Sequence, residues 1–515
     1  MLDRCARTIA VVVGSLVFSC AFAASRPAVP VSPPLGLPQA QARGPLAELY
    51  SRIERAVASA DRGDAAAARR ELDAIVADPL FPTLSAQQQR ELLSTNAVLA
   101  WKGEDTARAA ELMRAATVAY GNDPDDWYRL AILELQLGQR SRATRQMAAF
   151  VRRWPELVNN LDRLVLSDLL FQGEPRDEDL IALMDALFDA HWTDNDRGVD
   201  EVWPELALLH LGRGGRERAE AVVATIKSPM ALASMRSDLR FDPLHDALAR
   251  LPSVEAAATG EVERLRALHA KFPKRVDLAA DLGTALLVAG RDTESLAVSE
   301  AALAAIEAAG EAGSFESFED RIWVMNNKAI ALRRAGRFDE AATQFELAGE
   351  LDENGGDNVS QRLNLGTFLC RIGRPTDALR VIEPVGHMSG YGRMVQTAVR
   401  HCAALQLRDT AGAAKALAYL YDHRADARGI VVDELLRAGD VDRAAAELIR
   451  SLDDPRSRAQ ALESVQQFRA PLPLPAFPQM DANRAKLVAR ADVQAAVGRV
   501  GRALRHEIFN VSGVD

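Results

Sequence analysis

The sequence predicts an all-α protein: a right-handed α-solenoid of about ten helix-turn-helix repeats with a C-terminal capping helix. Three observations predict this class. A pattern of small and large residues recurs with a period in the thirties, which is typical of helix pairs that each pack on their neighbours. Apolar residues make up 48% of the chain but aromatic residues only 5%, and the alanine-rich remainder favours helix. Glycines fall where the two helices of a pair would turn.

The clearest copies of the pattern lie in the second half of the chain. One copy reads Ala329-x2-Leu332-x3-Gly336-x4-Ala341-x3-Phe345-x2-Ala348. The spacing returns 37 residues later (329 to 366) as Gly366, Leu369, Gly373, Ala378, Ile382 and Val385. It also fits an earlier stretch with Trp127, Leu130, Ala131, Glu134, Gly138, Ala143, Met147, Phe150 and Pro155. Small residues let two antiparallel helices approach closely, and the large residues fill the seam between them.

This pattern resembles the tetratricopeptide repeat family, whose motif is Trp-x2-Leu-Gly-x2-Tyr, then Ala-x3-Phe, then Pro. The resemblance covers most of residues 46–455 and is strongest at 120–155 and 322–386. It implies a curved array whose concave side is lined by the first helix of each pair. In the family, that groove commonly receives peptides or extended protein segments.

The N-terminus has the features of an export signal. Arg4 and Arg7 precede an apolar run, residues 8–18, that is too short to span a bilayer. Ala21-Phe22-Ala23 matches the A-x-A cleavage pattern. We therefore expect residues 1–23 to be a signal peptide that directs the mature chain to a bacterial periplasm.

Processing as a lipoprotein at Cys20 is an alternative to this cleavage. It would make the chain an outer-membrane lipoprotein, with the membrane contacted only through that lipid anchor. Six prolines in residues 24–45 predict an extended, disordered linker on either reading.

Turn residues divide the rest of the chain into units. They are Gly63, Gly103, Gly138, Gly173, Gly214, Gly290, Gly336, Gly373, Asp409 and Gly439. The stretch Ser228–Pro273 fits the pattern poorly, so we expect an N-terminal array at 46–260 and a C-terminal array at 261–470.

A proline-rich connector and a capping helix form the predicted last segment, residues 471–515. The helix is expected from Asp481 to about His506. A terminal helix that covers the open end of a solenoid is the expected device. The basic residues of this helix allow a second interpretation, docking on a membrane or a partner. They are Arg484, Lys486, Arg490, Arg499, Arg502 and Arg505.

Two cysteines, Cys370 and Cys402, lie outside the signal, on the first helices of adjacent units. An exported protein can form a disulfide between them. The alternative is a pair of buried thiols that act as small hydrophobic residues.

Composition and motifs point away from several function classes. The formal net charge is 62 − 72 = −10, which argues against a general nucleic-acid binder. The eight histidines are scattered, and the sequence lacks His-Glu-x-x-His, Cys-x-x-Cys, a phosphate-binding glycine loop and Gly-x-Ser-x-Gly. We therefore expect no catalytic residue, cofactor or metal.

The predicted binding residues follow from the family resemblance. In the family, an asparagine at the sixth repeat position can hydrogen-bond a ligand's main chain, and Asn327 and Asn364 hold that position here. Asn326, Arg334 and Arg371 are expected nearby, where a guanidinium suits an acidic segment or a free C-terminus. The alternative is that these residues belong to the scaffold and contact no ligand.

The sequence thus predicts a non-enzymatic periplasmic scaffold that binds segments of partner proteins, most of them in the cell envelope. One alternative is an anchored accessory lipoprotein of an envelope secretion or polysaccharide export complex. A second is an enzyme whose site lies in residues 228–273.

Overall fold

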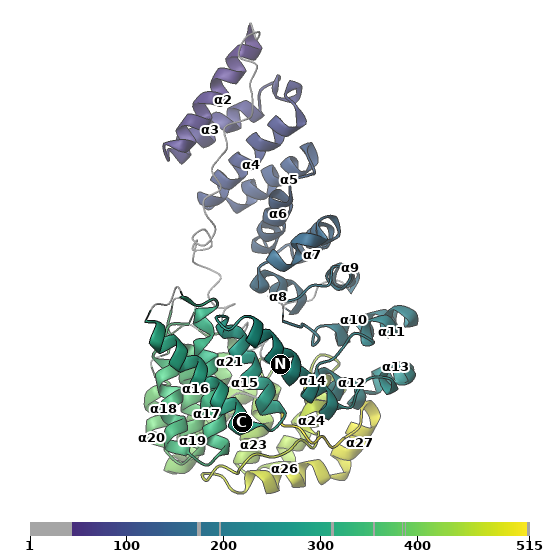
Figure 1. Cartoon of the computed structure of the whole chain (residues 1–515), viewed down its shortest axis with the longest axis vertical. Helices are drawn as coiled ribbons and strands as arrows, with labels where there is room; N and C mark the ends of the chain where they lie inside the picture. Colours follow the sequence, from purple (N-terminus) through teal and green to yellow (C-terminus); the bar gives the residue numbers. More distant parts are fainter. Residues whose placement is uncertain are drawn as a thin grey trace. The chain divides into compact units, whose positions relative to one another are not determined.

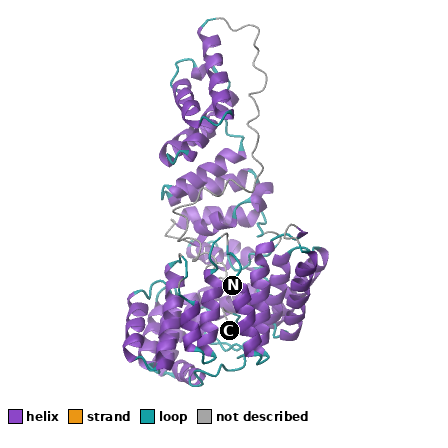
Figure 2. Cartoon of the chain, turned by 90° about the vertical axis from the view of Figure 1, so that its left-hand side faces the viewer, coloured by secondary structure: helices purple, strands orange, loops and turns teal. Residues whose placement is uncertain are grey.

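The computed structural model describes most of the chain after residue 43. The described ranges are 44–171, 177–194, 197–310, 314–353, 356–383, 385–386 and 388–511. Within these ranges helices dominate, and the only β-structure is a few isolated bridges (Figure 2). The all-α class is therefore confirmed. The predicted signal peptide, Cys20 and nearly all of the linker lie outside the described residues.

The chain divides into two compact units between Val199 and Asp200. We call the described residues 44–199 the N-terminal unit and residues 200–511 the C-terminal unit. The N-terminal unit contains α2 (Pro45–Asp61), α3 (Ala65–Val76), η2 (Phe81–Thr83), α4 (Ala86–Lys102), α5 (Thr106–Ala119), α6 (Pro124–Gln136), α7 (Arg140–Arg153), η3 (Pro155–Asn160), α8 (Arg163–Phe171) and α9 (Asp177–Asp189) (Figure 1).

The C-terminal unit is longer, and its first part contains α10 (Trp203–Gly212), α11 (Arg216–Val223), α12 (Pro229–Ser237), η4 (Leu239–Leu244), α13 (His245–Ala249), α14 (Val254–Lys271), α15 (Val276–Val288), α16 (Asp292–Ala309) and η6 (Phe318–Asp320). Its second part contains α17 (Arg321–Arg334), α18 (Phe338–Gly349), α19 (Val359–Arg371), α20 (Pro375–Val381), α21 (Gly390–Leu407), α22 (Thr410–Asp422), α23 (Arg428–Arg437), α24 (Val441–Asp453), α25 (Arg458–Ser464), α26 (Met480–Ala489) and α27 (Ala491–Val500).

A helix pair surrounds each of the nine predicted turn residues that the structure describes; the tenth, Gly173, lies outside the described residues. The turn glycines with left-handed backbone are Gly63, Gly138, Gly214, Gly290, Gly336, Gly373 and Gly439, with φ between 70° and 88°. Gly103 departs from this rule because its φ is −87°, and the next residue, Glu104, takes the left-handed conformation at φ 62°. The second helix of that pair is shifted by one residue as a result. The predicted array of helix pairs is therefore confirmed.

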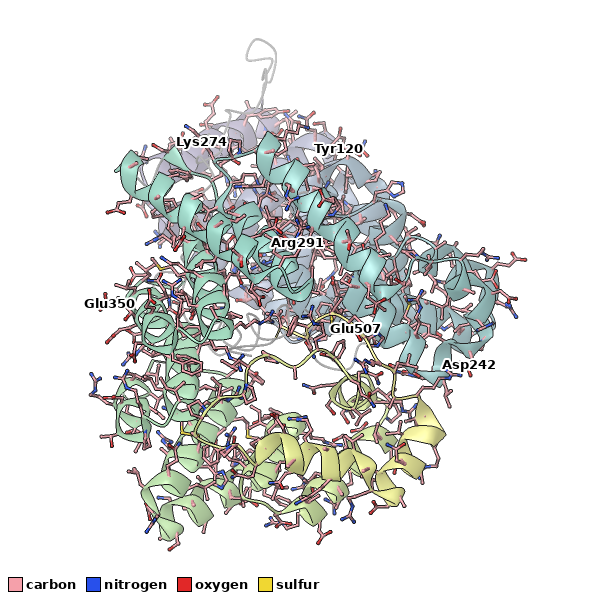
Figure 3. All side chains as sticks on the ribbon, turned by 60° about the horizontal axis from the view of Figure 1, so that its bottom comes forward. Tyr120, Asp242, Lys274, Arg291, Glu350 and Glu507 are labelled. Carbon is pink, nitrogen blue, oxygen red and sulfur yellow. A yellow bond between two sulfur atoms is a disulfide. The ribbon has the colours of Figure 1, made fainter. Side chains whose placement is uncertain are left out.

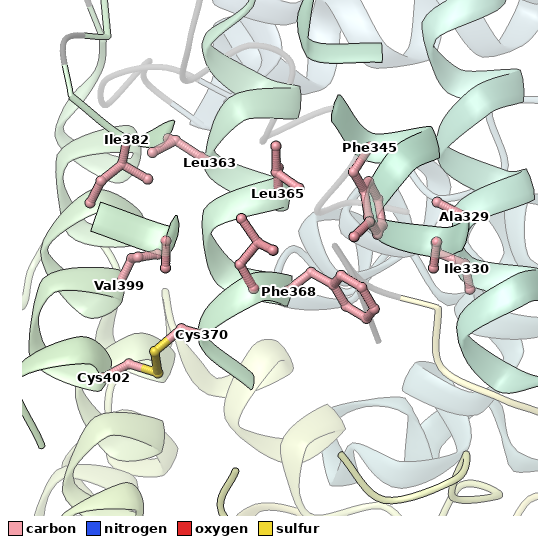
Figure 4. Close-up of a cluster of buried hydrophobic side chains, with 14 of the residues drawn as sticks. Ala329, Ile330, Phe345, Leu363, Leu365, Phe368, Cys370, Ile382, Val399 and Cys402 are labelled. Carbon is pink, nitrogen blue, oxygen red and sulfur yellow. A yellow bond between two sulfur atoms is a disulfide. The ribbon is translucent and has the colours of Figure 1, made fainter. Parts of the chain in front are cut away.

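The repeat pattern fills the seams between helices, as Figure 4 shows for the pairs around Phe345. Ala329, Ala341 and Phe345 are fully buried in one continuous core. Gly366 marks the closest approach of α19 and α20, since a Cβ there would lie 2.4 Å from Cγ2 of Ile382. Small residues thus occupy the crossing points, and large ones supply the buried apolar area that stabilises each pair.

Cys370 on α19 and Cys402 on α21 are joined by a disulfide with an S–S distance of 2.10 Å (Figure 4). Both side chains belong to the same buried core as Phe345. The bond links the first helices of adjacent pairs, so it crosses the seam between two repeats rather than closing one repeat on itself.

The stretch predicted to be irregular, Ser228–Pro273, is instead closely packed. Phe241 and Leu244 of η4 and Val262 of α14 are buried. The sequence pattern is weak here because two short helices, α12 and α13, are joined by the 3-10 helix η4 and followed by the long α14, not because the packing ends. The division of the chain lies earlier, at 199, than the boundary at 260 that the pattern suggested.

The last segment contains two helices where the sequence predicted one. Arg490 adopts an extended backbone, with ψ 137°, and separates α26 from α27. Leu487, Val493 and Val497 of these helices are buried against the last pairs of the array, so the two helices cover its end. Their arginines form ion pairs with acidic residues of α23 and α24: Arg484 with Asp433, Arg490 with Asp442, and Arg499 with Asp453.

Candidate functional site

The candidate site lies at the C-terminal ends of the first helices in the C-terminal unit. An α-helix leaves its last carbonyl groups without partners inside the helix. Helices α15, α19 and α23 each end two residues before a left-handed turn glycine, namely Gly290, Gly373 and Gly439. The repeat therefore places carbonyl acceptors at the ends of these three helices, which belong to alternate pairs.

Two extended segments that flank α26 and α27 reach these acceptors. We call residues 466–479 the connector and residues 501–511 the tail. Two of their backbone donors bond to the helix ends: Phe509 N to Val288 O at 2.9 Å and Ala476 N to Arg371 O at 3.0 Å. A third donor, Asn483 Nδ2 of the adjacent α26, bonds to Leu436 O at 2.9 Å. The array thus already holds an extended polypeptide along its helix ends, and that polypeptide is its own.

Arginine and phenylalanine side chains add to these backbone contacts. The ring of Phe509 lies between two guanidinium groups, with its centroid 4.1 Å from Cζ of Arg334 and 4.6 Å from Cζ of Arg469. Arg334 is fixed by hydrogen bonds to Leu287 O at 2.8 Å and to Asp292 at 2.9 Å. A cation fixed above an aromatic face attracts the ring's negative face.

Glycine at the turn leaves the space that Phe509 occupies. A Cβ added at Gly290 would lie 2.9 Å from Cε2 of Phe509 and 2.7 Å from Nη1 of Arg469. The same glycine that allows the left-handed turn therefore also admits the aromatic ring.

The tail also pairs with the connector and with α12 and η4, near the start of the C-terminal unit. Backbone hydrogen bonds join Gln467 N to Leu504 O, His506 N to Gln467 O, and Arg469 N to Ile508 O, each at 2.9 Å. Arg502 N donates to Ser237 O at 2.7 Å, and its side chain pairs with Asp242 at 2.8 Å. Figure 3 shows the yellow segment that carries Glu507 approaching the teal helices, with Asp242 beyond it. The tail therefore connects the early helices of this unit to its last ones.

The predicted asparagines are part of the packing rather than of an open groove. Asn327 is fully buried, and its Nδ2 donates to Ala280 O at 2.6 Å while its Oδ1 accepts from Thr284 at 3.1 Å. Asn326 is also buried and accepts from Nδ2 of Asn364 at 3.1 Å. These amides hold neighbouring first helices together, and both polar atoms of the Asn327 amide are used in that packing.

The predicted arginines do lie beside an extended segment. Arg334 contacts Phe509 of the tail, and the carbonyl of Arg371 accepts from the connector. Burial, with Arg437 close by, lowers the pKa of Arg371 to about 10. Sequence reasoning thus found two residues next to the segment but did not identify the segment itself. The proline-rich run and the isolated Phe477 and Phe509 were the available signals.

A buried ionic cluster supports the connector. His401 Nδ1 lies 2.7 Å from Glu434, and Glu434 accepts two hydrogen bonds from Nε of Arg437 at 3.1 Å. Burial alone would favour the neutral acid, but Arg437 and His401 hold the pKa of Glu434 below its usual value. The Arg437 guanidinium lies 4.7 Å from the ring centroid of Phe477. The cluster therefore fixes the cation on which this second phenylalanine packs.

A separate hollow of about 950 Å³ lies over α21, between α20 and α22. It opens because α20 has only 7 residues, whereas α18 has 12 and α22 has 13. Its wall includes Arg400, which pairs with Glu383 at 2.6 Å. None of its lining residues belongs to the connector or the tail, so this hollow is distinct from the helix-end surface.

Three acidic residues of the region suggested for an enzyme site make structural contacts. Asp238 pairs with Arg240, Asp242 with Arg502, and Glu255 accepts from the amide of Glu507. Among the residues that the structure describes, no group of three or more His, Cys, Asp or Glu side chains could hold a metal ion. In the same part of the chain, no helix combines the length and the apolar character needed to cross a membrane.

Comparisons with known proteins yield little. No protein-family model matches the chain, and no curated protein matches its sequence. A crystal structure of the APC/C hetero-tetramer Cut9–Hcn1 is similar at 12% sequence identity, with coverage of 89% of this chain and 96% of that chain, but the TM-score is 0.27. The fold therefore rests on the helix pairs themselves.

Proposed function

We propose that this protein is a non-enzymatic scaffold for protein–protein interaction whose helix pairs bind extended segments of partner proteins. One observation supports this proposal above the others. The first-helix ends of the C-terminal unit hold the connector and the tail by backbone hydrogen bonds and by arginine–phenylalanine contacts. Backbone donors are present in every polypeptide, so the same chemistry accepts a segment from another protein.

We also propose that the protein works in the bacterial cell envelope, after export. The support is the N-terminal sequence alone, with its basic start, short apolar run and cleavage pattern. Mass spectrometry of the mature protein tests this directly. A first residue near Ala24 supports a periplasmic protein, a lipidated Cys20 supports an anchored one, and an intact residue 1 contradicts export.

Photo-crosslinking in the native envelope tests the scaffold function. A photoreactive residue is placed at Phe171, the end of a first helix in the N-terminal unit, or at Leu472 in the connector, which are 40% and 49% exposed. A matched control is Leu347, 42% exposed on the second helix α18. We expect discrete crosslinked proteins from the first two positions and few from the control.

Two outcomes would contradict the scaffold proposal. One is the absence of any crosslinked protein at all three positions in folded protein. The other is the same diffuse set of products at the control and at the two test positions, because a binding surface must distinguish first-helix ends from outer helices.

A further inference from the structure

We propose that the helix-end surface of the C-terminal unit is an exchangeable peptide site. The tail competes there with an extended partner segment that carries a phenylalanine. The inference deepens the proposed scaffold function and rests on it for the existence of a partner. It follows from three properties of the surface, which are its preformed receptor groups, its selectivity, and the separation of its present occupant from the core around α27.

The receptor groups belong to the array and do not depend on the tail. Arg334 is held by Leu287 O and Asp292, both within the helix pairs, and its side chain is only 2% exposed. The carbonyl of Val288 is fixed at the end of α15 by the helix itself. Gly290 provides the adjacent space. An incoming segment would therefore meet a cation, an acceptor and a cavity already in place.

Selectivity comes from the aromatic ring and not from the backbone bonds. Any extended chain can donate an N–H to Val288 O, so this contact distinguishes no sequence. The space beside Gly290 and the guanidinium of Arg334 fit a flat ring, and Phe509 fills that space with 6% of its surface exposed. A partner segment should accordingly present a phenylalanine flanked by residues in extended conformation.

The tail is attached at points that lie outside the core around α27. Val493, Ala496 and Val497 bury α27 in the core of the last pairs. After Val500 the chain is extended, and it is held by backbone hydrogen bonds and by the buried side chains of Ile508 and Phe509, which do not belong to that core. The ion pair of Arg502 with Asp242 is exposed and adds little to this attachment. A segment that supplies the same contacts can therefore displace the tail while α27 stays folded.

The test uses the full-length chain and a fluorescent peptide with the sequence of residues 501–511. In the wild type, the tethered tail has a high effective concentration and should exclude the free peptide. Phe509→Ala removes the anchor of the tethered tail only. We expect this variant to bind the free peptide roughly tenfold more tightly than the wild type does, measured by fluorescence anisotropy.

Controls separate the site from general loosening. Phe272→Ala removes a phenylalanine of the same unit that is 36% exposed and does not contact the tail, so it should leave peptide binding at the wild-type level. A peptide whose own phenylalanine is replaced by alanine should not bind to the Phe509→Ala variant. If that variant does not fold, Ile508→Ala replaces it, since it shortens a buried side chain of the tail, 2% exposed, and leaves the helix pairs unchanged.

Equal peptide binding by the wild type and a folded loosened variant would overturn the exchange proposal, because the tail would then be a fixed part of the fold. This result is independent of the scaffold function. Peptide exchange without any envelope crosslink would support the exchangeable site and contradict the scaffold function. Crosslinks without peptide exchange would support the scaffold function and contradict the exchangeable site.

Discussion

The two units of this protein use the same repeat but treat the ends of their first helices differently. In the N-terminal unit, carbonyls near these ends accept from the turn that follows, as Trp101 O of α4 does from Glu104 N at 3.0 Å. Among the described residues of that unit, no distant backbone donor reaches them. In the C-terminal unit, Val288 and Arg371 accept from the tail and the connector. Helix ends of the same repeat can therefore accept hydrogen bonds from the turn that follows them or from a distant segment of the chain.

The difference arises outside the repeats. Both units join their pairs by buried polar contacts, such as Ser94 to Asp126 in one and Thr284 to Asn327 in the other. Only the C-terminal unit is followed by a proline-rich stretch and an extended tail. The segments that flank a solenoid, and not its repeat consensus, thus decide which surfaces remain free.

The largest effect should come from the core that both units share. Phe345→Ala removes a fully buried ring and should cost about 3–5 kcal/mol of unfolding free energy in the C-terminal unit. The matched change Met113→Ala, also fully buried, should cost about 2–5 kcal/mol in the N-terminal unit. Hydrogen exchange resolved by region checks both. Unchanged protection in either unit would show that the repeat cores are not equivalent.

Reduction of the disulfide should destabilise only the C-terminal unit. The bond between Cys370 and Cys402 closes a separation of 32 residues, and a cross-link of that span stabilises by roughly 3–4 kcal/mol in the chain-entropy model. Residues 44–199 contain no cysteine. A reducing agent should therefore lower the guanidinium midpoint of the C-terminal unit alone. Free thiols in the native, unreduced protein would contradict the disulfide.

Removal of a buried asparagine amide should destabilise the two units by similar amounts, and by less than the loss of a core side chain. Asn327→Ala leaves the carbonyl of Ala280 without its donor, and Asn96→Ala removes a hydrogen bond to Asp73 at 2.8 Å. Each change should destabilise its unit by about 1–3 kcal/mol. Urea unfolding of the two variants provides the measurement. If Asn327→Ala unfolds like the wild type but captures less partner, the asparagine is a ligand group after all.

The smallest expected effect is a pH dependence of the attachment of the tail, and it concerns the C-terminal unit alone. Burial lowers the pKa of His506 from its ordinary value; nearby Glu255 opposes the shift and Arg236 adds to it. The bound tail thus holds His506 neutral, whereas the released tail takes up a proton more readily. Its attachment should weaken as pH falls from above the ordinary histidine pKa to below the lowered one.

Exchange of the Phe509 amide between about pH 7 and about pH 5, corrected for its intrinsic rate, measures this effect. His506→Gln should remove the dependence, while His269→Gln serves as the control because burial also lowers the pKa of His269 but that residue lies away from the tail. Glu255 should not mask the result. Backbone hydrogen bonds, including that from Glu507, hold its pKa below the usual value despite burial.

The sequence predicted local structure well and long-range contacts poorly. The spacing of small residues located the nine predicted turns that the structure describes, because a helix pair is specified by residues close in sequence. The one-residue shift after Gly103 was visible in the sequence, but its cause, the left-handed Glu104, was not. The sequence assigned Asn327 to a repeat position on a first helix, but it did not reveal that its amide bonds to Ala280 and Thr284 of α15.

The tail could not be placed from sequence because its partners are too remote. Arg502 and Asp242 are 260 positions apart, and Glu507 and Glu255 are 252 apart. No periodicity connects such residues. The cysteines were a similar case, since their spacing allowed a bond or two buried thiols, and only the distance between sulfur atoms distinguishes these.

These remote contacts also affect how the C-terminal unit acquires its structure. A solenoid with neighbour contacts alone can nucleate at any pair and spread outward. The bonds of Arg502 to Ser237 and Asp242 cannot form until the first helices and the C-terminal tail of this unit have both folded. Because contacts of high sequence separation slow folding, refolding should show a fast phase for the helix pairs and a later one in which the extremities join.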